Sequence, residues 1–375
     1  MTSGPACSRD KGSHLSALPS DEMRQVMWRF DDRRDLRQLV SAARAVARGP
    51  VARLVVEGGR DTHEWTARKD SLLDAFADHG LTRVFVEPEY GGVTAGPTGL
   101  ATSLAAYELA WVDGGAATCF IALGLAAQPL VELGTEQQKR AFLGTGTGSA
   151  GVGRRGPCGA FCLTEPLPYT GVDTGMLSGK VRIAEWGDGE PVLHVRKQGR
   201  FTNNMDFATF VTVAVASDDP RIKGTCMVIL HQDDAGTFDR GAVTRKLAHQ
   251  LASTRDPVFD MRVPASRIVG GYEVRDGVIV PHFGHARILE SVFARTRVPA
   301  GVMTGAKLLS SIEPIIRYQR ERFRGGEGAP GTPRHELGLQ TKEDAVHKLV
   351  EIWAAGEAAC SLGFAAARQL DAYAL

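Results

Sequence analysis

The sequence has almost no excess of charge of either sign. Its 44 Lys and Arg residues stand against 43 Asp and Glu residues, which leaves a net charge of +1. Proteins that bind nucleic acid or an anionic membrane usually carry a basic patch or a strongly positive balance. Two short Arg-containing clusters, at residues 295–297 and 317–324, are typical of solvated helix faces. We therefore expect no nucleic-acid partner.

Long apolar runs and a leader sequence are lacking as well. We identify no apolar run that reaches the ~18 residues a membrane-spanning helix needs. Residues 1–14 are polar and contain no apolar core of a signal peptide. These absences predict a chain without a membrane span, located in the cytoplasm.

Cysteine is sparse and scattered, with six residues in 375. The two nearest to each other, Cys158 and Cys162, form a CxxxC spacing without a second pair or a nearby histidine. That arrangement is poor for zinc, which needs four converging ligands. We expect buried free thiols and no metal site.

The apolar pattern divides the chain into four parts. Residues 1–30 show no periodicity and are interpreted as a flexible tail, and residues 31–150 as an α-helical domain. Within that domain, residues 99–131 are rich in Ala and Leu, and TEQQ at 135–138 predicts a capped helix start. FVEPEYGG at 85–92 predicts an extended piece closed by a glycine turn.

Residues 151–272 have a different texture, with short β-rich runs separated by Gly, Asp and Asn. Several short strands with turns between them predict a small β-barrel or sandwich. The runs lie at residues 160–164, 192–196, 209–216, 225–230 and 257–263.

Residues 273–375 return to a helical pattern, which we expect to run from about residue 281 to 323 with kinks at Pro299 and Pro314. The last segment carries an apolar stripe at 3–4 spacing, which predicts a long helix with one face that needs partners. The overall prediction is an α+β fold: N-terminal helices, a middle barrel and a C-terminal helical bundle. The stripe comprises Val346, Leu349, Trp353, Gly356, Cys360, Gly363, Phe364, Ala367 and Leu370.

Several motifs in this order resemble one known family. FCLTEP at 161–166, followed by GVD at 171–173, resembles the (Y/F)-x-x-T-E-P…G-(S/T)-D signature of acyl-CoA dehydrogenases. KQGRFTN at 197–203, residues 246–270, EPEYGG at 87–92 and residues 296–323 resemble further family segments. The resemblance covers about residues 35–375 and implies FAD as the cofactor.

The resemblance also implies particular cofactor contacts. Phe161, Leu163 and Thr164 would contact the isoalloxazine ring, with Phe201 and Thr202 beside it. This is chemically reasonable because a strand edge offers both N–H groups and a hydroxyl to the flavin. The alternative is that the two phenylalanines are only core aromatics of the barrel.

Other implied contacts lie near the C-terminal helices. Arg322, with Phe323, resembles the arginine that reaches the FAD pyrophosphate of a neighbouring subunit, and a guanidinium suits phosphate. Thr170, Phe293 and Arg297 correspond to acyl-CoA contacts. The alternatives are a surface charge for Arg322 and a helix-surface ion pair for Arg297.

The match has departures that bear on catalysis. Members of the family remove an α-proton from the substrate with a glutamate, which most of them carry late in the C-terminal helices. We expect this chain to end before that segment, so that its C-terminal helical bundle is incomplete. A minority of members place the base where this chain has Thr296, and Glu290 lies nearly two turns earlier. The catalytic residue is therefore left unknown. Arg200 also stands where many members have tryptophan, and residues 325–339 look like an insertion.

The implied function is FAD-dependent α,β-desaturation of an acyl-CoA thioester, with electrons passed to an electron-transfer flavoprotein. The implied assembly is a homotetramer or a heteromer with a homologue. Because no base is identified, an alternative is a non-catalytic partner subunit of a heteromeric acyl-CoA dehydrogenase. A nucleic-acid-associated relative is disfavoured by the net charge of +1.

Overall fold

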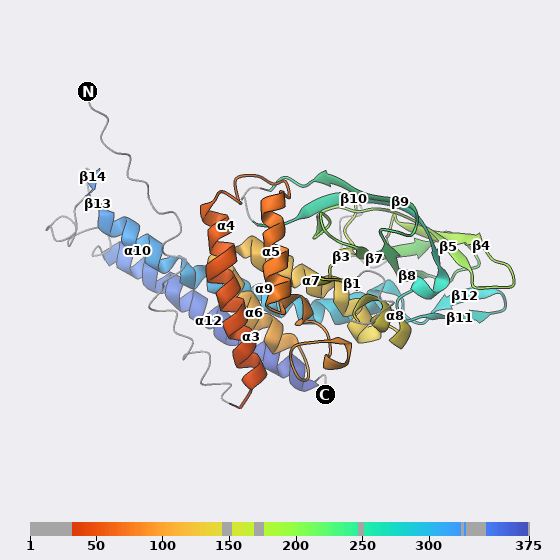
Figure 1. Cartoon of the computed structure of the whole chain (residues 1–375), viewed down its shortest axis with the longest axis horizontal. Coiled ribbons are helices and arrows are strands. Elements are labelled where there is room, and N and C mark those ends of the chain that lie inside the picture. Colours follow the sequence, from red (N-terminus) through yellow and green to blue (C-terminus); the bar gives the residue numbers. More distant parts are fainter. Residues whose placement is uncertain are drawn as a thin grey trace, which may run out of the picture.

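Helices precede and follow a β-sheet, in the order that the sequence predicts (Figure 1). The computed structural model describes residues 32–144, 152–168, 176–246, 251–323, 326–327 and 343–373. The molecule is elongated, with the sheet at one end and helix α10 at the other. The predicted tail at residues 1–30 lies outside the described residues.

The N-terminal part is helical throughout. Two of its helices, α6 and α7, are almost wholly buried because their Ala, Gly and Leu residues allow close approach on every side. The predicted cap of α8 is confirmed as a capping box between Thr135 and Gln138. The elements are α3 (Arg34–Val46), η2 (Ala47–Val51), α4 (Ala52–Val56), α5 (Ala67–Asp78), η3 (Leu81–Arg83), η4 (Pro88–Tyr90), α6 (Gly99–Val112), α7 (Gly114–Leu133) and α8 (Glu136–Phe142).

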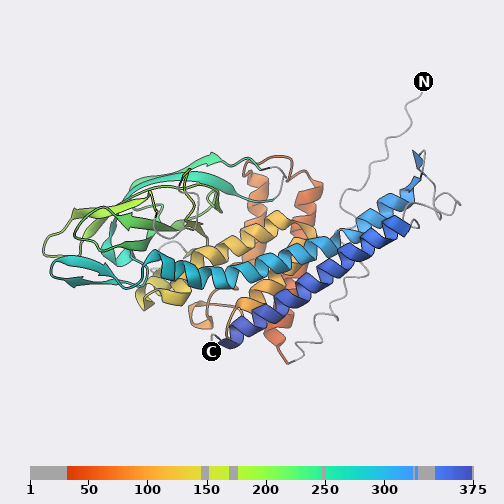
Figure 2. The same cartoon turned by 180° about the vertical axis from the view of Figure 1, so that it is seen from behind.

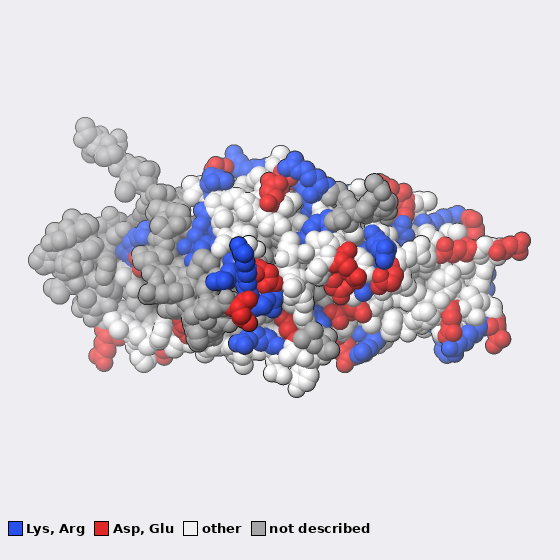
Figure 3. All heavy atoms as spheres, turned by 60° about the horizontal axis from the view of Figure 1, so that its bottom comes forward, with Lys and Arg blue, Asp and Glu red and all other residues white. Residues whose placement is uncertain are grey.

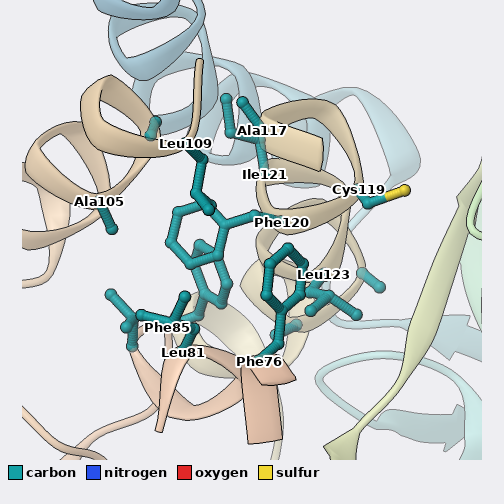
Figure 4. Packing of buried hydrophobic residues seen from close by; sticks show 14 of the residues in the cluster. Phe76, Leu81, Phe85, Ala105, Leu109, Ala117, Cys119, Phe120, Ile121 and Leu123 are labelled. Carbon is teal, nitrogen blue, oxygen red and sulfur yellow. The ribbon is translucent and has the colours of Figure 1, made fainter. Parts of the chain in front are cut away.

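Aromatic rings fill the core between these helices (Figure 4). Phe120 on α7 is fully buried, with its ring centroid 4.8 Å from that of Phe85 and 6.3 Å from that of Phe76. Tilted and edge-on ring pairs at such distances add to the free energy of burial. This aromatic cluster fixes α7 against α5 and the segment after η3.

The sequence predicts an extended piece before the glycines of EPEYGG, and this prediction is wrong. Pro88–Tyr90 forms the short 3-10 helix η4, which ends where Gly91 adopts a left-handed φ of 90°. The following Gly92 lies so close to the main chain that a Cβ there would overlap the carbonyl oxygen of Val86. The glycine turn is therefore confirmed, and backbone contact is the reason for the second glycine.

Replacing Gly92 by alanine is expected to destabilise the fold much more than replacing Gly96. Gly96 has a positive φ of 76° but open space around it, so Gly96→Ala should cost only about 1 kcal/mol of backbone strain. Gly92→Ala must displace main chain and should cost at least about twice as much. Urea unfolding followed by circular dichroism measures both; equal losses would contradict this account.

Eight strands form one curled sheet around a second apolar core. Strand order is β3-β7-β4-β5-β10-β6, with β8 on β7 and β9 on β10; β3 and β4 both pair with β7 in parallel. All five predicted runs are strands, whereas β4, β6 and β9 lie outside the predicted runs. The strands are β3 (Gly159–Cys162), β4 (Lys180–Glu185), β5 (Val192–Gln198), β6 (Thr202–Asn203), β7 (Phe210–Ser217), β8 (Thr225–His231), β9 (Ala235–Val243) and β10 (Thr254–Pro264).

Smaller elements frame this sheet. The hairpin β11 (Tyr272–Arg275) and β12 (Val278–Pro281) was also missed, and it directly precedes the first C-terminal helix. The remaining elements are the hairpin β1 (Val152–Gly153) with β2 (Gly156–Pro157), and η5 (Ala265–Arg267). Glycine-rich, partly exposed strands such as β9 lack the apolar alternation by which strands are recognised.

The predicted helix from residue 281 to 323 is divided. Helix α9 (His285–Ser310) continues through Pro299, and α10 (Ile312–Glu321) starts after a break at Ser311. Pro314 lies in the first turn of α10, where its missing N–H is not needed, so the break precedes the proline. The chain then forms strand β13 (Arg322–Phe323), paired with β14 (Gly326–Glu327), instead of more helix.

Helix α12 (Glu343–Tyr373) carries the predicted apolar stripe and lies along α9 (Figure 2). The C-terminal half of the stripe is covered within the chain: Cys360, Phe364 and Ala367 are buried, and the Phe364 ring lies 5.8 Å from that of Tyr107 on α6. Trp353, in the other half, is 53% exposed. The expectation that the whole face lacks partners is therefore wrong for its C-terminal half.

Two described helices, α7 and α12, are long and apolar enough to cross a membrane by length and composition. Both helices contain polar residues, such as Gln128 and Glu132 in α7, so neither is an uninterrupted apolar run. Core helices meet the same criterion, and α7 is mostly buried between α6, α9 and the sheet, whereas most of α12 is not buried. One or two such helices are weak evidence for a span. Lys, Arg, Asp and Glu side chains are interspersed over the face shown in Figure 3.

Candidate functional site

A pocket of about 170 Å³ lies where the sheet meets α7 and α9. Five of the residues that the sequence predicts to contact the cofactor or the substrate line this pocket, although they come from separate parts of the chain. The described lining residues are Ala122, Leu125, Phe161, Leu163, Thr164, Arg200, Phe201, Asn203 and Phe293. Six of these nine residues are apolar, and Thr164, Arg200 and Asn203 are polar, so the wall offers both kinds of surface.

A buried ion pair fixes the end of strand β3 at this pocket. The Nζ of Lys197 on β5 donates to the Oε1 of Glu165 at 2.6 Å and to the carbonyl of Leu163 at 3.1 Å. Neither charged side chain is more than 1% exposed. The other Glu165 oxygen accepts the Ser178 N–H at 2.7 Å. The pair holds Leu163 and Thr164 at a defined position on the pocket wall.

The protonation state of Glu165 follows from these contacts. Burial by itself opposes ionisation, but the hydrogen bond and charge of Lys197 outweigh it, together with the N–H groups of Ser178 and Gly179. The net result is that the pKa of Glu165 is lowered from its usual value. Glu165 is therefore a satisfied structural carboxylate and does not line the pocket.

Phe201 has a strained backbone at the pocket mouth. Its φ is +56°, a left-handed conformation that is uncommon for residues other than glycine, and its side chain is 49% exposed. The Phe201 N–H donates to Oδ1 of Asp256 at 2.8 Å, which also accepts the Thr244 hydroxyl at 3.0 Å. Strain that is held in place beside a pocket is typical of binding sites.

The two predicted threonines differ in their placement. Thr164 lines the pocket, and its hydroxyl makes no hydrogen bond to the rest of the described chain, so it is available to a ligand. Thr202 does not line the pocket. Its hydroxyl is buried and has no hydrogen-bond partner among the described residues.

The substrate residues predicted on α9 form a stacked pair. The Arg297 guanidinium lies 5.1 Å from the centre of the Phe293 ring, within the range of a cation–π interaction. Phe293 lines the pocket and Arg297 is exposed beside it. The predicted Thr170 lies outside the described residues.

A second, much smaller pocket lies next to the first between α6, α7 and α9. It includes Thr296, whose hydroxyl donates to the carbonyl of Val292 at 3.0 Å. No Asp or Glu occurs among the described residues that line either pocket. Glu290 is 73% exposed and ion-paired with Arg287, in agreement with the expectation that it does not face the position of Thr296.

The predicted phosphate-binding residues lie far from this pocket. Strand β13, which contains Arg322 and Phe323, is at the far end of α10, whereas the pocket is at the sheet (Figure 1). The side chains of both residues lie outside what the structure describes. Their predicted contact would thus have to be made with another subunit.

Sequence reasoning did not identify Arg200, Asn203 or the two α7 residues, Ala122 and Leu125, as lining the pocket. Asn203 ends the KQGRFTN motif and could have been found there, whereas nothing local distinguishes the α7 residues from core residues.

Five described cysteines are free and buried, as expected. Among the described residues, no group of three metal-ligating side chains is close enough to hold a metal ion.

Comparison with known proteins finds acyl-CoA dehydrogenases by sequence. Residues 33–146 match the family model described as acyl-CoA dehydrogenase, N-terminal domain. The short-chain specific acyl-CoA dehydrogenase of Megasphaera elsdenii is 31% identical over 205 residues, or 53% of this chain. The chain therefore spans about half the length of this curated relative, 50%.

Solved structures of the same kind share the fold. Butyryl-CoA dehydrogenase from Megasphaera elsdenii superposes with a TM-score of 0.70 at 23% identity, over 90% of this chain and 80% of its own. The acyl-CoA dehydrogenase from Bacillus anthracis complexed with FAD gives a TM-score of 0.71 at 20% identity, over 96% of this chain and 54% of its own. Residues 33–146 therefore belong to the acyl-CoA dehydrogenase family, and the chain has the acyl-CoA dehydrogenase fold.

Proposed function

We propose that this chain is an FAD-dependent oxidoreductase of the acyl-CoA dehydrogenase type. The observation that carries the proposal is the pocket between sheet, α7 and α9, where Phe161, Leu163, Thr164, Phe201 and Phe293 come together. Such a pocket, with apolar walls and a few polar groups, is the usual form of a cofactor site.

The residues present fit an aromatic ring system with a polar edge. Phe161 and Leu163 offer an apolar wall. The hydroxyl of Thr164, which has no hydrogen-bond partner among the described residues, offers a hydrogen bond at the end of β3. Bound FAD would supply the acceptor for two electrons, which no side chain can do. The ion pair of Lys197 and Glu165 would keep the ring-binding edge in place, and the apolar walls would exclude water.

The proposed substrate is an acyl-CoA thioester, with electrons passed on to an electron-transfer flavoprotein. Phe293 would contact the substrate in the pocket, and the exposed Arg297 beside it would attract the negatively charged CoA moiety. Arg322 would bind the pyrophosphate of FAD in a neighbouring subunit, because strand β13, which contains it, lies at the end of the molecule opposite the sheet (Figure 1).

The second candidate function is that of a non-catalytic partner subunit. It is favoured by the lining of the two pockets, which contains no Asp or Glu among the described residues. α-Proton abstraction needs a base within hydrogen-bond reach of the substrate. Such a subunit would bind flavin without oxidising acyl-CoA.

One experiment separates these functions. The 375-residue chain is purified, its visible spectrum is recorded, and a panel of acyl-CoAs is added without oxygen. Bound flavin that bleaches with one acyl-CoA supports the enzyme; bound flavin that no acyl-CoA bleaches supports the partner subunit. A soluble, folded chain that binds no FAD on reconstitution would overturn the proposal.

A further inference from the structure

One charged side chain, that of Arg200, occurs among the described residues that line the pocket. Its guanidinium lies 4.7 Å from the centre of the Phe201 ring. Within the described part of the chain it forms no ion pair. The pocket therefore contains a permanent positive charge that no described carboxylate balances, because a guanidinium does not lose its proton in proteins.

The turn that carries Arg200 is held firmly. The Arg200 N–H donates to the carbonyl of Thr164 at 2.8 Å, and the preceding Gly199 N–H donates to that of Pro257 at the same distance. The next residue, Phe201, is held in its left-handed conformation by Asp256. The backbone beneath the guanidinium is thus fixed on both sides, and its bond to Thr164 links it to the proposed ring-binding edge.

We propose that Arg200 tunes the flavin by placing a fixed positive charge in its pocket. The inference rests on the proposed function. Uptake of two electrons and one proton from a reductant leaves the ring system with one more negative charge than before. A positive charge in a partly desolvated pocket stabilises that form over the neutral oxidised form. Arg200 therefore makes the bound flavin easier to reduce than the neutral tryptophan that many relatives carry here would.

The test uses the full chain reconstituted with FAD and the variants Arg200→Gln, Arg200→Trp and Arg200→Lys. Sulfite is the probe, because it adds to oxidised flavin through one new S–N bond and leaves a negative charge on the ring. Arg200→Gln and Arg200→Trp are expected to bind sulfite at least about tenfold more weakly, and Arg200→Lys within about threefold of the native chain. A matching tenfold change in the reduction equilibrium lowers the midpoint potential by about 30 mV for two electrons.

The matched control is Arg196→Gln. Arg196 lies on β5, is 62% exposed and pairs with Asp260 at 3.5 Å. Its substitution by Gln therefore removes the same charge at a position outside the pocket. Sulfite affinity should then stay within about twofold of the native value. If Arg200→Gln loses flavin, Arg200→Trp provides the comparison.

Two results would overturn the inference in different ways. Native sulfite affinity in flavin-containing Arg200→Gln or Arg200→Trp would overturn it and leave the proposed function intact. A native chain that takes up no FAD would overturn the proposed function and this inference together.

Discussion

Lys197→Met is expected to lower the free energy of unfolding by about 3–5 kcal/mol, the usual loss when one partner of a buried ion pair is removed. Lys197 and Glu165 are both essentially inaccessible to solvent, with Nζ and Oε1 2.6 Å apart, so the variant leaves an uncompensated carboxylate. It also removes the donors to the carbonyls of Leu163 and Ala214. Urea unfolding followed by circular dichroism at pH 7 gives the loss.

The pH dependence tests the mechanism of this loss. In the native chain the pKa of Glu165 is lowered below 4.5, so its contribution is present above that pH and is lost as the pH falls through the folded-state pKa. In Lys197→Met, burial still opposes ionisation of Glu165, and only the N–H groups of Ser178 and Gly179 still favour it. We expect its pKa to rise above the native value, so the variant recovers stability as the pH falls from 7 towards 5. The difference between the two proteins should therefore shrink over that range.

Two controls accompany this variant. The exposed Lys223→Met should change stability by less than about 0.5 kcal/mol. The double variant with Glu165→Gln should recover most of the loss, because no charge is then left buried. A loss that stays constant from pH 7 to pH 5, and persists in the double variant, would show that packing and not charge causes it.

Phe120→Ala is expected to lower the free energy of unfolding by about 3–5 kcal/mol, because it opens a cavity in a core that cannot close around it. Phe120 is fully buried and contacts both Phe76 and Phe85, which come from segments on either side of η3 (Figure 4). The same measurement in urea gives this loss.

Tyr373→Ala is the matched control for this variant. Tyr373, near the end of α12, is 80% exposed, so its ring should contribute less than about 0.5 kcal/mol. Similar losses in Phe120→Ala and Tyr373→Ala would contradict the assignment of this aromatic cluster as the core of the N-terminal helices.

Much of the fold follows from local patterns in the sequence. The order of helices, strands and helices, the capping box at Thr135 and the five strong strands depend on residues close together in the chain. The motif at residues 161–166 contains Phe161 and Thr164, and the structure places both on the pocket wall. Periodicity and capping are properties of neighbouring residues, so one sequence suffices to recognise them.

Other features are set by contacts between distant segments. The pair between Lys197 and Glu165 joins residues 32 positions apart, and the left-handed Phe201 is held by Asp256, 55 positions away. Strand β9 forms because β10 pairs with it, although apolar and polar residues do not alternate regularly along β9 itself. Local propensity cannot report such interactions, because their free energy arises only when the partners meet.

The sequence by itself determined the element types, the α+β order and the motif residues of the candidate site, because these depend on local chemistry. Only the tertiary structure decided that Ala122 and Leu125 of α7 complete the pocket and that Arg200 is the charged residue among its described lining residues. It also decided that the C-terminal half of the α12 stripe is covered by the chain's own helices. Each of these depends on which surfaces pack together, and packing joins residues that the sequence keeps far apart.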